Sequence, residues 1–150
     1  MTNKDNGTRR IIATMSKIEI LANRIIIQEL NKHRIEGLVP SHGNILVQLF
    51  AEKEMKMKDL AERINKKKNT VTTLVNKLVL CGYVQKTTHR HDNRVSLISL
   101  TEKGESLKKD FEEISDELLS MTYKGFSWKE KKEIMNYLDR IAENFIQGKL

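Results

Sequence analysis

Residues 58–82 read KDLAERINKKKNTVTTLVNKLVLCG, and this stretch decides the fold. It predicts a short helix over 58–64, which Asn65 is placed to end by adopting the left-handed conformation. A second helix is predicted over 68–80, because apolar residues recur there at the three-and-four spacing of one helical face. The inward face of this second helix consists of Val71, Leu74, Val75 and Leu78. Two helices joined by so short a turn are typical of a helix-turn-helix.

The outer face of the second helix carries short, uncharged, hydrogen-bonding side chains. A helix of this size enters the major groove of double-stranded DNA, where such side chains reach base edges. The predicted base contacts are Asn69, Thr70, Thr72, Thr73 and Asn76. Lysines near the helix ends suit phosphates, which position a protein without specifying sequence. The predicted phosphate contacts are Lys66, Lys67, Lys68 and Lys77.

Alternating and β-branched residues predict a β-hairpin over 83–100, the wing of a winged helix. The tip of this hairpin is the polar sequence HRHDN. Arg90 and Arg94 lie around the tip, where we expect a guanidinium to enter the narrow minor groove. Asp92 is expected to pair with Arg94 or a neighbouring basic group and so hold the hairpin in shape.

Further helices are predicted on both sides of these elements. Apolar residues at helical spacing indicate a long helix over about 9–36, and Ser41 is expected to cap the next helix. The stretch 52–57 is polar, and no element is predicted there. Thr101 is placed to cap a helix that runs to about 123. A capping box at 127–130 is expected to start the last helix.

The sequence therefore predicts a mostly α fold with a small β-hairpin, a winged helix-turn-helix with N- and C-terminal dimerisation helices. Its length of 150 residues suits a single winged-helix domain over 1–150. We expect the DNA-binding lobe at about 41–100 and the dimerisation helices at about 9–36 and 102–147. These outer helices carry more apolar surface than one small core absorbs, which favours a homodimer.

The positive charge is concentrated in the predicted DNA-binding part. The chain has 27 Lys and Arg against 20 Asp and Glu, a net charge of +7. Between Arg63 and Lys103 there are nine basic residues and two acidic ones, so this segment holds the whole excess. Such localisation is typical of a surface that meets a polyanion.

Other classes of protein fit the sequence poorly. It shows no glycine-rich phosphate loop and no nucleophile with a plausible base, so we predict neither an enzyme nor a cofactor. His89 and His91 beside Asp92 could suggest a metal site, but phosphate contact or solvation fits this loop better, and no metal is predicted. No apolar run suits a signal peptide or a membrane span, and the lone Cys81 excludes an internal disulfide, so a cytoplasmic location without membrane partners is expected.

Two motifs of the sequence resemble those of MarR-family regulators. The wing and its exit, from Asp92 and Arg94 through LTEKG at 100–104, resemble the D-x-R…L-T-x-x-G signature of that family. Upstream, LAERI at 60–64 and TVTTLVNKL at 70–78 are similar to the helix-turn-helix of the family. The resemblance implies a dimeric winged-helix transcription factor whose wing arginine, here Arg94, enters a minor groove.

The resemblance also implies a small, aromatic or phenolic effector bound between the dimer helices and the DNA-binding lobe. The matching positions here are Met15, Ile18, His42, Ile45 and Leu49. Simple core packing is the alternative for these residues. The chain departs from the family where Lys66 and Lys67 replace an apolar residue and a Ser or Thr cap. It also lacks the first-helix cysteine of the peroxide sensors.

The leading hypothesis is a dimeric, sequence-specific regulator that binds a pseudo-palindromic operator in double-stranded DNA, a repressor that a small-molecule effector releases. The alternative is a winged-helix module that binds a protein partner and has no sequence-specific DNA binding. The two differ in oligomeric state and in preference for one DNA sequence over another.

Overall fold

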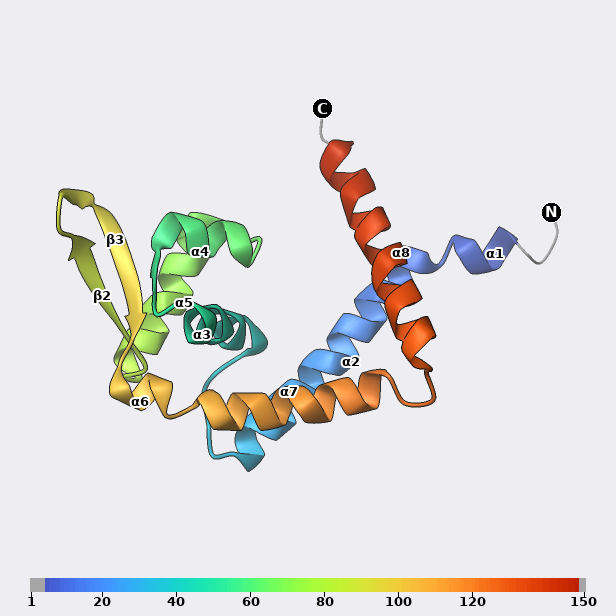
Figure 1. Cartoon of the computed structure of the whole chain (residues 1–150), viewed down its shortest axis with the longest axis horizontal. Helices are drawn as coiled ribbons and strands as arrows, with labels where there is room; N and C mark the ends of the chain where they lie inside the picture. The colour runs from blue at the N-terminus through green and yellow to red at the C-terminus, as the bar shows by residue number, and fades with distance from the viewer. Residues whose placement is uncertain (1–4, 149–150) are drawn as a thin grey trace. The chain divides into compact units, whose positions relative to one another are not determined.

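The computed structural model describes residues 5–148, which form two compact units, one ending at Ser115 and the other beginning at Asp116. Figure 1 shows the order of the elements along the chain. The helices are α1 (Asp5–Thr8), α2 (Ile11–Lys32), α3 (Pro40–Ala51), α4 (Met57–Arg63), α5 (Lys68–Leu80), α6 (Glu102–Glu105), α7 (Lys108–Thr122) and α8 (Trp128–Gln147). The strands are β1 (Glu54–Lys56), β2 (Val84–His89) and β3 (Asp92–Leu100). The fold is therefore mostly helical with a small antiparallel sheet, as predicted.

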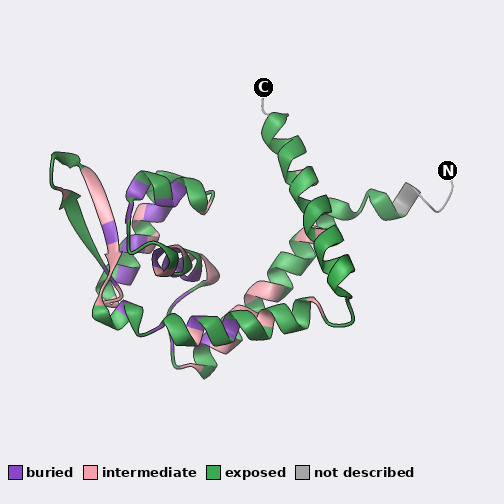
Figure 2. Cartoon of the chain, in the orientation of Figure 1, coloured by how far each residue is buried: buried purple, intermediate pink, exposed green. Residues whose placement is uncertain are grey.

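The core of the first unit lies among α3, α4, α5 and the sheet. In Figure 2 the buried residues gather on these elements and on the start of α7. Its most deeply buried side chains are Leu30, Ile45, Leu46, Leu49, Leu60, Leu78, Ile98, Val71 and Val75. Helix α5 thus buries the inward face that its apolar spacing predicts, and its bounds are those predicted from the sequence.

Helices α4 and α5 form the predicted helix-turn-helix. Asn65 has a φ of 53° and ends α4, since the N–H groups of Asn65 and Lys66 turn back to bond Glu62 O and Ala61 O. Gly82, with a φ of 80°, ends α5 through the same pair of bonds, made to Val79 O and Leu78 O. The end of α4 sets the length of the turn before α5, and the end of α5 sets the residue at which the wing begins.

The wing belongs to a three-stranded sheet of order β1-β3-β2, with both pairs antiparallel. The sequence predicts the hairpin of β2 and β3 but not β1, because the three residues of β1 carry too little alternation to indicate a strand. Met55 of β1 pairs with Ile98 of β3, and both side chains are buried. This pairing ties the base of the wing to the segment that leads into α4.

Some predicted helix ends differ from those observed. Ser41 is not the cap of α3; Val39 is, with Pro40 in the first helical position, where its missing N–H costs nothing. The side chain of His42 reaches back, and its Nδ1 accepts the Val39 N–H at 2.9 Å. Helix α2 ends earlier than predicted, because Arg34 adopts a φ of 60°.

The helix predicted from Thr101 to about 123 is divided into α6 and α7. The Thr101 side chain caps α6 as expected, its Oγ1 accepting the Gly104 N–H at 3.1 Å. The chain then tightens for one turn, in which Leu107 N–H bonds Gly104 O at 3.1 Å, before α7 begins. A hydrogen bond between residues three apart is typical of a 3₁₀ turn, and it interrupts the series of α-helical hydrogen bonds without reversing the chain.

The second unit comprises the end of α7 and helix α8. The predicted capping box is present: Ser127 Oγ accepts the Glu130 N–H at 3.2 Å, and Glu130 Oε2 accepts the Ser127 N–H at 2.6 Å. Helix α8, which is described over its full length, holds no buried residue. Of the helices within residues 5–148, none is long and apolar enough to cross a membrane.

Candidate nucleic-acid interface

The outer face of α5 exposes the side chains predicted to contact bases. Asn69, Thr70, Thr73 and Asn76 are exposed, and Thr72 is partly buried. The Thr72 hydroxyl donates to Lys68 O at 2.9 Å and the Thr73 hydroxyl to Asn69 O at 3.1 Å. With their protons engaged on the helix, these two hydroxyls face outward as acceptors. Asn69 and Asn76 carry both amide donors and carbonyl acceptors, the pairing group that matches adenine in the major groove.

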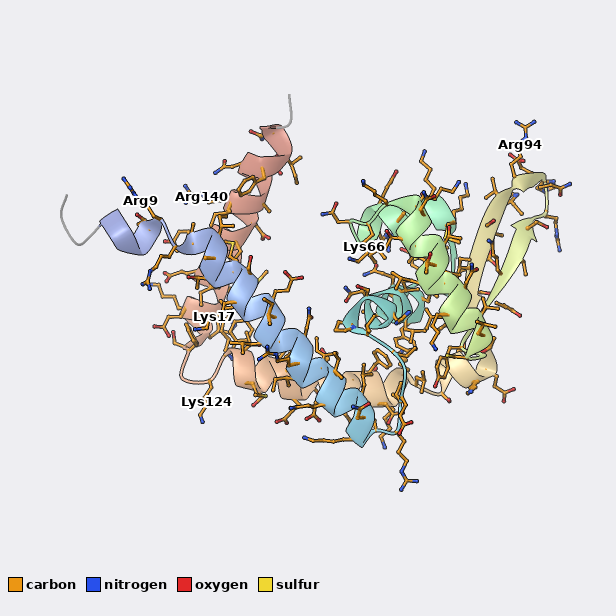
Figure 3. All side chains as sticks on the ribbon, turned by 180° about the vertical axis from the view of Figure 1, so that it is seen from behind. Arg9, Lys17, Lys66, Arg94, Lys124 and Arg140 are labelled. Carbon is orange, nitrogen blue, oxygen red and sulfur yellow. The ribbon has the colours of Figure 1, made fainter. Side chains whose placement is uncertain are left out.

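The start of α5 is basic and is not capped by a side chain. Lys67 occupies the N-cap position in an extended conformation, and within the described residues its side chain accepts no N–H of the first turn. Lys66, Lys67 and Lys68 are all exposed here, and Figure 3 shows Lys66 at the turn. Free N–H groups at a helix start, next to lysines, attract a phosphate. The basic turn therefore replaces the usual cap with a site that suits the DNA backbone.

Lys77 lies apart from the other three lysines. Its Nζ is 3.7 Å from the position that a Cβ on Gly37 would occupy, beside the connection between α2 and α3. Burial lowers the pKa of His42, and the charge of Lys77 lowers it further. Lys77 thus lies in the C-terminal half of α5, near enough to the buried His42 for its charge to lower the pKa of that imidazole.

The wing tip presents arginine on a hairpin held by a carboxylate. Asp92 Oδ1 accepts the backbone N–H of Arg94 at 2.9 Å, so the aspartate shapes the turn through the backbone. Figure 3 shows the Arg94 side chain at the tip, pointing away from the strands, and Arg90 is also exposed. His89 Nδ1 accepts the His91 N–H at 3.2 Å. Over residues 5–148 no group of three His, Cys, Asp or Glu is arranged to hold a metal ion.

The residues that the family resemblance suggested for an effector differ in burial. Ile45 and Leu49 are fully buried in the core, whereas Ile18 on α2 is 60% exposed. An apolar pocket of about 310 Å³ lies between α3 and α7. It is lined by Val47, Phe50, Ala51, Lys108, Phe111, Glu112 and Ser115. The rings of Phe50 and Phe111 meet edge to face at 5.6 Å, a tertiary contact that no feature of the sequence predicts.

The geometry defines a winged helix-turn-helix protein in which the recognition helix α5 starts with lysines and the wing carries Arg94 at its tip. Comparison with known proteins agrees: the MarR family model matches residues 38–96, from the start of α3 into the wing. The HTH-type transcriptional regulator SarZ of Staphylococcus haemolyticus is 30% identical over 100 residues, 67% of each chain. SarZ of Staphylococcus aureus is 31% identical over 102 residues, 67% of this chain and 68% of that one.

Solved structures show the same fold. A MarR transcriptional regulator from Methanosarcina mazei has a TM-score of 0.81 at 24% identity, covering 93% of this chain and 98% of that one. A mutant MarR from E. coli, complexed with operator DNA, has a TM-score of 0.80 at 14% identity, covering 93% and 99%. The chain belongs to the MarR family. It is a DNA-binding transcriptional regulator and not an enzyme.

Proposed function

We propose that two copies of this chain bind a pseudo-palindromic operator in double-stranded DNA. The observation that carries the proposal is the exposed polar face of α5, bounded by the lysines at its start and placed beside a wing that presents Arg94. Asn69, Thr70, Thr72, Thr73 and Asn76 supply the base contacts. Lys66, Lys67, Lys68 and Lys77 supply phosphate contacts, and Arg90 and Arg94 enter the minor groove.

The apolar surface that the outer helices expose supports a homodimer. Helix α8 has no buried residue, and α2 has one, Leu30. Large apolar side chains that remain exposed on these two helices are Ile11, Ile12, Ile18, Ile20, Leu21, Ile27, Trp128, Met135, Tyr137, Leu138, Phe145 and Ile146. Continuous exposed apolar stripes of this kind mark interfaces. A second copy supplies the same stripes in a closed, two-fold arrangement.

The two-fold arrangement sets the form of the operator. Two recognition helices of a dimer read half-sites about one helical turn apart, roughly 34–36 Å. A protein seated across such a site covers the DNA between its half-sites, and we infer repression of nearby genes as its mode of action. The relatives bound to DNA in solved structures include MarR of E. coli on operator DNA and MepR of S. aureus. The proposed location is the cytoplasm, where the DNA lies.

A small aromatic or phenolic effector is proposed to release the DNA. The pocket between α3 and α7 supports this part of the proposal, because about 310 Å³ suits one substituted ring and two phenylalanines line it. Lys108 at the rim offers a positive charge to an acidic ring substituent. A panel of benzoates and phenols, titrated into the protein–DNA complex, tests this part. If a panel member releases the DNA from the parent protein but not from Phe111→Ala, the result supports the pocket. If the same compound releases the DNA equally well from the variant, the effector binds elsewhere.

The DNA-binding proposal is tested by light scattering and a DNA titration. We expect a particle of twice the 17.4 kDa chain mass. We also expect it to bind a duplex from the region upstream of its own coding sequence far more tightly than a scrambled duplex, with affinity that falls steeply as salt rises. A monomer that is indifferent to sequence would instead favour a winged-helix module that binds a protein partner.

A further inference from the structure

The C-terminal end of the recognition helix α5 is held by residues from a distant part of the sequence. The last carbonyl groups of a helix lack intrahelical donors and carry partial negative charge. Here the Gly82 and Tyr83 N–H groups satisfy Val79 O and Leu78 O. Just beyond the last residue of α5, the carbonyls of Cys81, Gly82 and Tyr83 all accept hydrogen bonds from Thr101 or Lys103.

These residues and Gly104 form a clasp over the helix end. The Thr101 hydroxyl donates to Gly82 O at 2.5 Å, and the Thr101 N–H donates to Tyr83 O at 3.0 Å. Gly104 presses against the same segment so closely that a Cβ there would lie 2.0 Å from Tyr83 O. Thr101 and Gly104 are the threonine and the glycine that the L-T-x-x-G motif specifies, and their contacts explain why these positions need a hydroxyl and a residue without a side chain.

Lys103 occupies a variable position of that motif and adds two contacts of its own. Its Nζ donates to Cys81 O at 2.8 Å and lies 4.9 Å from the centroid of the Tyr83 ring. Its aliphatic stem crosses Gly82, with Cδ 3.6 Å from the position of a Cβ there. A cation at this place meets the negative end of the α5 dipole and the face of an aromatic ring together.

We infer that Lys103 is a positioning residue for DNA recognition, which holds the C-terminal end of α5 against α6 and so fixes the direction in which the base-reading face points. The inference rests on the proposed DNA-binding function. The Lys103 ammonium binds within the protein itself, to Cys81 O and the Tyr83 ring, and so differs in role from the lysines at the start of α5. Its removal deletes none of the proposed base-contacting side chains and takes away only contacts at the helix end.

The alternative is that Lys103 is one more phosphate contact, and the two roles give different results. Removal of a phosphate-binding lysine weakens binding to all sequences alike and lowers the slope of log affinity against log salt by about one. Removal of a positioning lysine weakens binding to the operator more than to other DNA, because only the specific complex needs the correct helix direction. The salt slope then stays the same.

The experiment compares Lys103→Met, Lys103→Arg and the control Lys109→Met in the full-length protein. Methionine keeps the stem without the charge, arginine keeps the charge over the ring, and Lys109 is an exposed lysine of α7. Each protein is titrated with the upstream duplex and the scrambled duplex over a series of salt concentrations. Amide hydrogen exchange at Gly82 and Tyr83 reports on the helix end in the absence of DNA.

For Lys103→Met we expect about three- to tenfold weaker binding to the upstream duplex, because the variant lacks one charged hydrogen bond and one cation–π interaction. Binding to the scrambled duplex and the salt slope stay unchanged, and Gly82 and Tyr83 exchange faster. Lys103→Arg keeps the parent's preference for the upstream duplex, and Lys109→Met binds both duplexes as the parent does. An unchanged ratio between the two duplexes, or a slope reduced by about one, overturns the inference. A parent protein without preference for the upstream duplex contradicts the proposed function instead.

Discussion

Replacing Gly104 by alanine is expected to destabilise the first unit strongly. The new Cβ would lie 2.0 Å from Tyr83 O, 2.9 Å from Tyr83 C and 3.1 Å from Leu100 Cδ2. Two of these three atoms belong to the backbone, so no rotation of a side chain relieves the contact. The clasp must move away from Tyr83 by about an ångström, because real Cβ atoms essentially never approach closer than 3.0 Å.

The magnitude follows from what that movement disturbs. Overpacking of this kind costs about 1–3 kcal/mol. The Thr101 N–H bond to Tyr83 O, 3.0 Å long, is stretched or broken at a further cost of about 1 kcal/mol. Alanine offsets up to about 1 kcal/mol through its helix propensity, since Gly104 lies inside α6. The net decrease in the free energy of unfolding is therefore about 1–3 kcal/mol.

Urea unfolding followed by circular dichroism measures this decrease. With a urea slope of about 2 kcal/mol/M, the midpoint falls by about 0.5–1.5 M. Protein concentration is held constant, because the proposed dimerisation would contribute to apparent stability. Gly7→Ala is the control, since a Cβ at Gly7 meets nothing within 4 Å. A Gly104→Ala protein within about 0.5 kcal/mol of the parent would refute the reasoning, because the close approach would then not constrain the fold.

Four further outcomes are expected. Arg94→Ala weakens operator binding in a gel-shift titration while light scattering still shows a folded dimer; unchanged affinity would contradict the wing's role. Lys67→Ala weakens binding to all duplexes about equally and lowers the salt slope by about one, and a selective decrease for the operator would argue against a phosphate contact. Burial, and then the charge of Lys77, lower the pKa of His42 in the folded protein. The stability that neutral His42 contributes is therefore present above the unfolded-state pKa of about 6.5, and it is lost as pH falls from there toward the folded-state pKa. Thermal melts of His42→Asn over this pH range should lack this pH dependence. Leu138→Asp places a charge on the apolar face of α8 and should convert the dimer to a monomer in light scattering, and an intact dimer would place the interface elsewhere.

Local signals in the sequence predict much of the fold. The bounds of α5 follow from its apolar spacing, and the caps at Thr101 and Ser127 follow from side chains that bond the N–H group three residues on. These features depend on neighbours along the chain. The chemistry of the candidate interface is predictable from the sequence for the same reason, because the polar face of α5 depends on the residues of one helix.

Features that depend on distant contacts are not accessible in this way. Strand β1 is three residues long and is defined by its pairing with β3. Val39 caps α3 because His42 turns back toward it, and Arg34 adopts a left-handed φ although glycine is the usual residue there. The pocket beside Phe111 and the clasp on Cys81 O both join segments far apart in the sequence. Neither periodicity nor spacing shows which side chains meet across such separations.

A spacing series tests most directly whether two identical recognition helices read two half-sites together. Once the upstream operator has been located by footprinting, about 5 base pairs, half a helical turn, are inserted between its half-sites, and affinity is measured at fixed salt. We predict that the insertion reduces binding to the level of the scrambled duplex, since the second recognition helix then faces the wrong side of the DNA. Insertion of about 10 base pairs restores the facing side but not the distance, so it should not recover full affinity. An operator that binds equally well at every spacing would contradict the account.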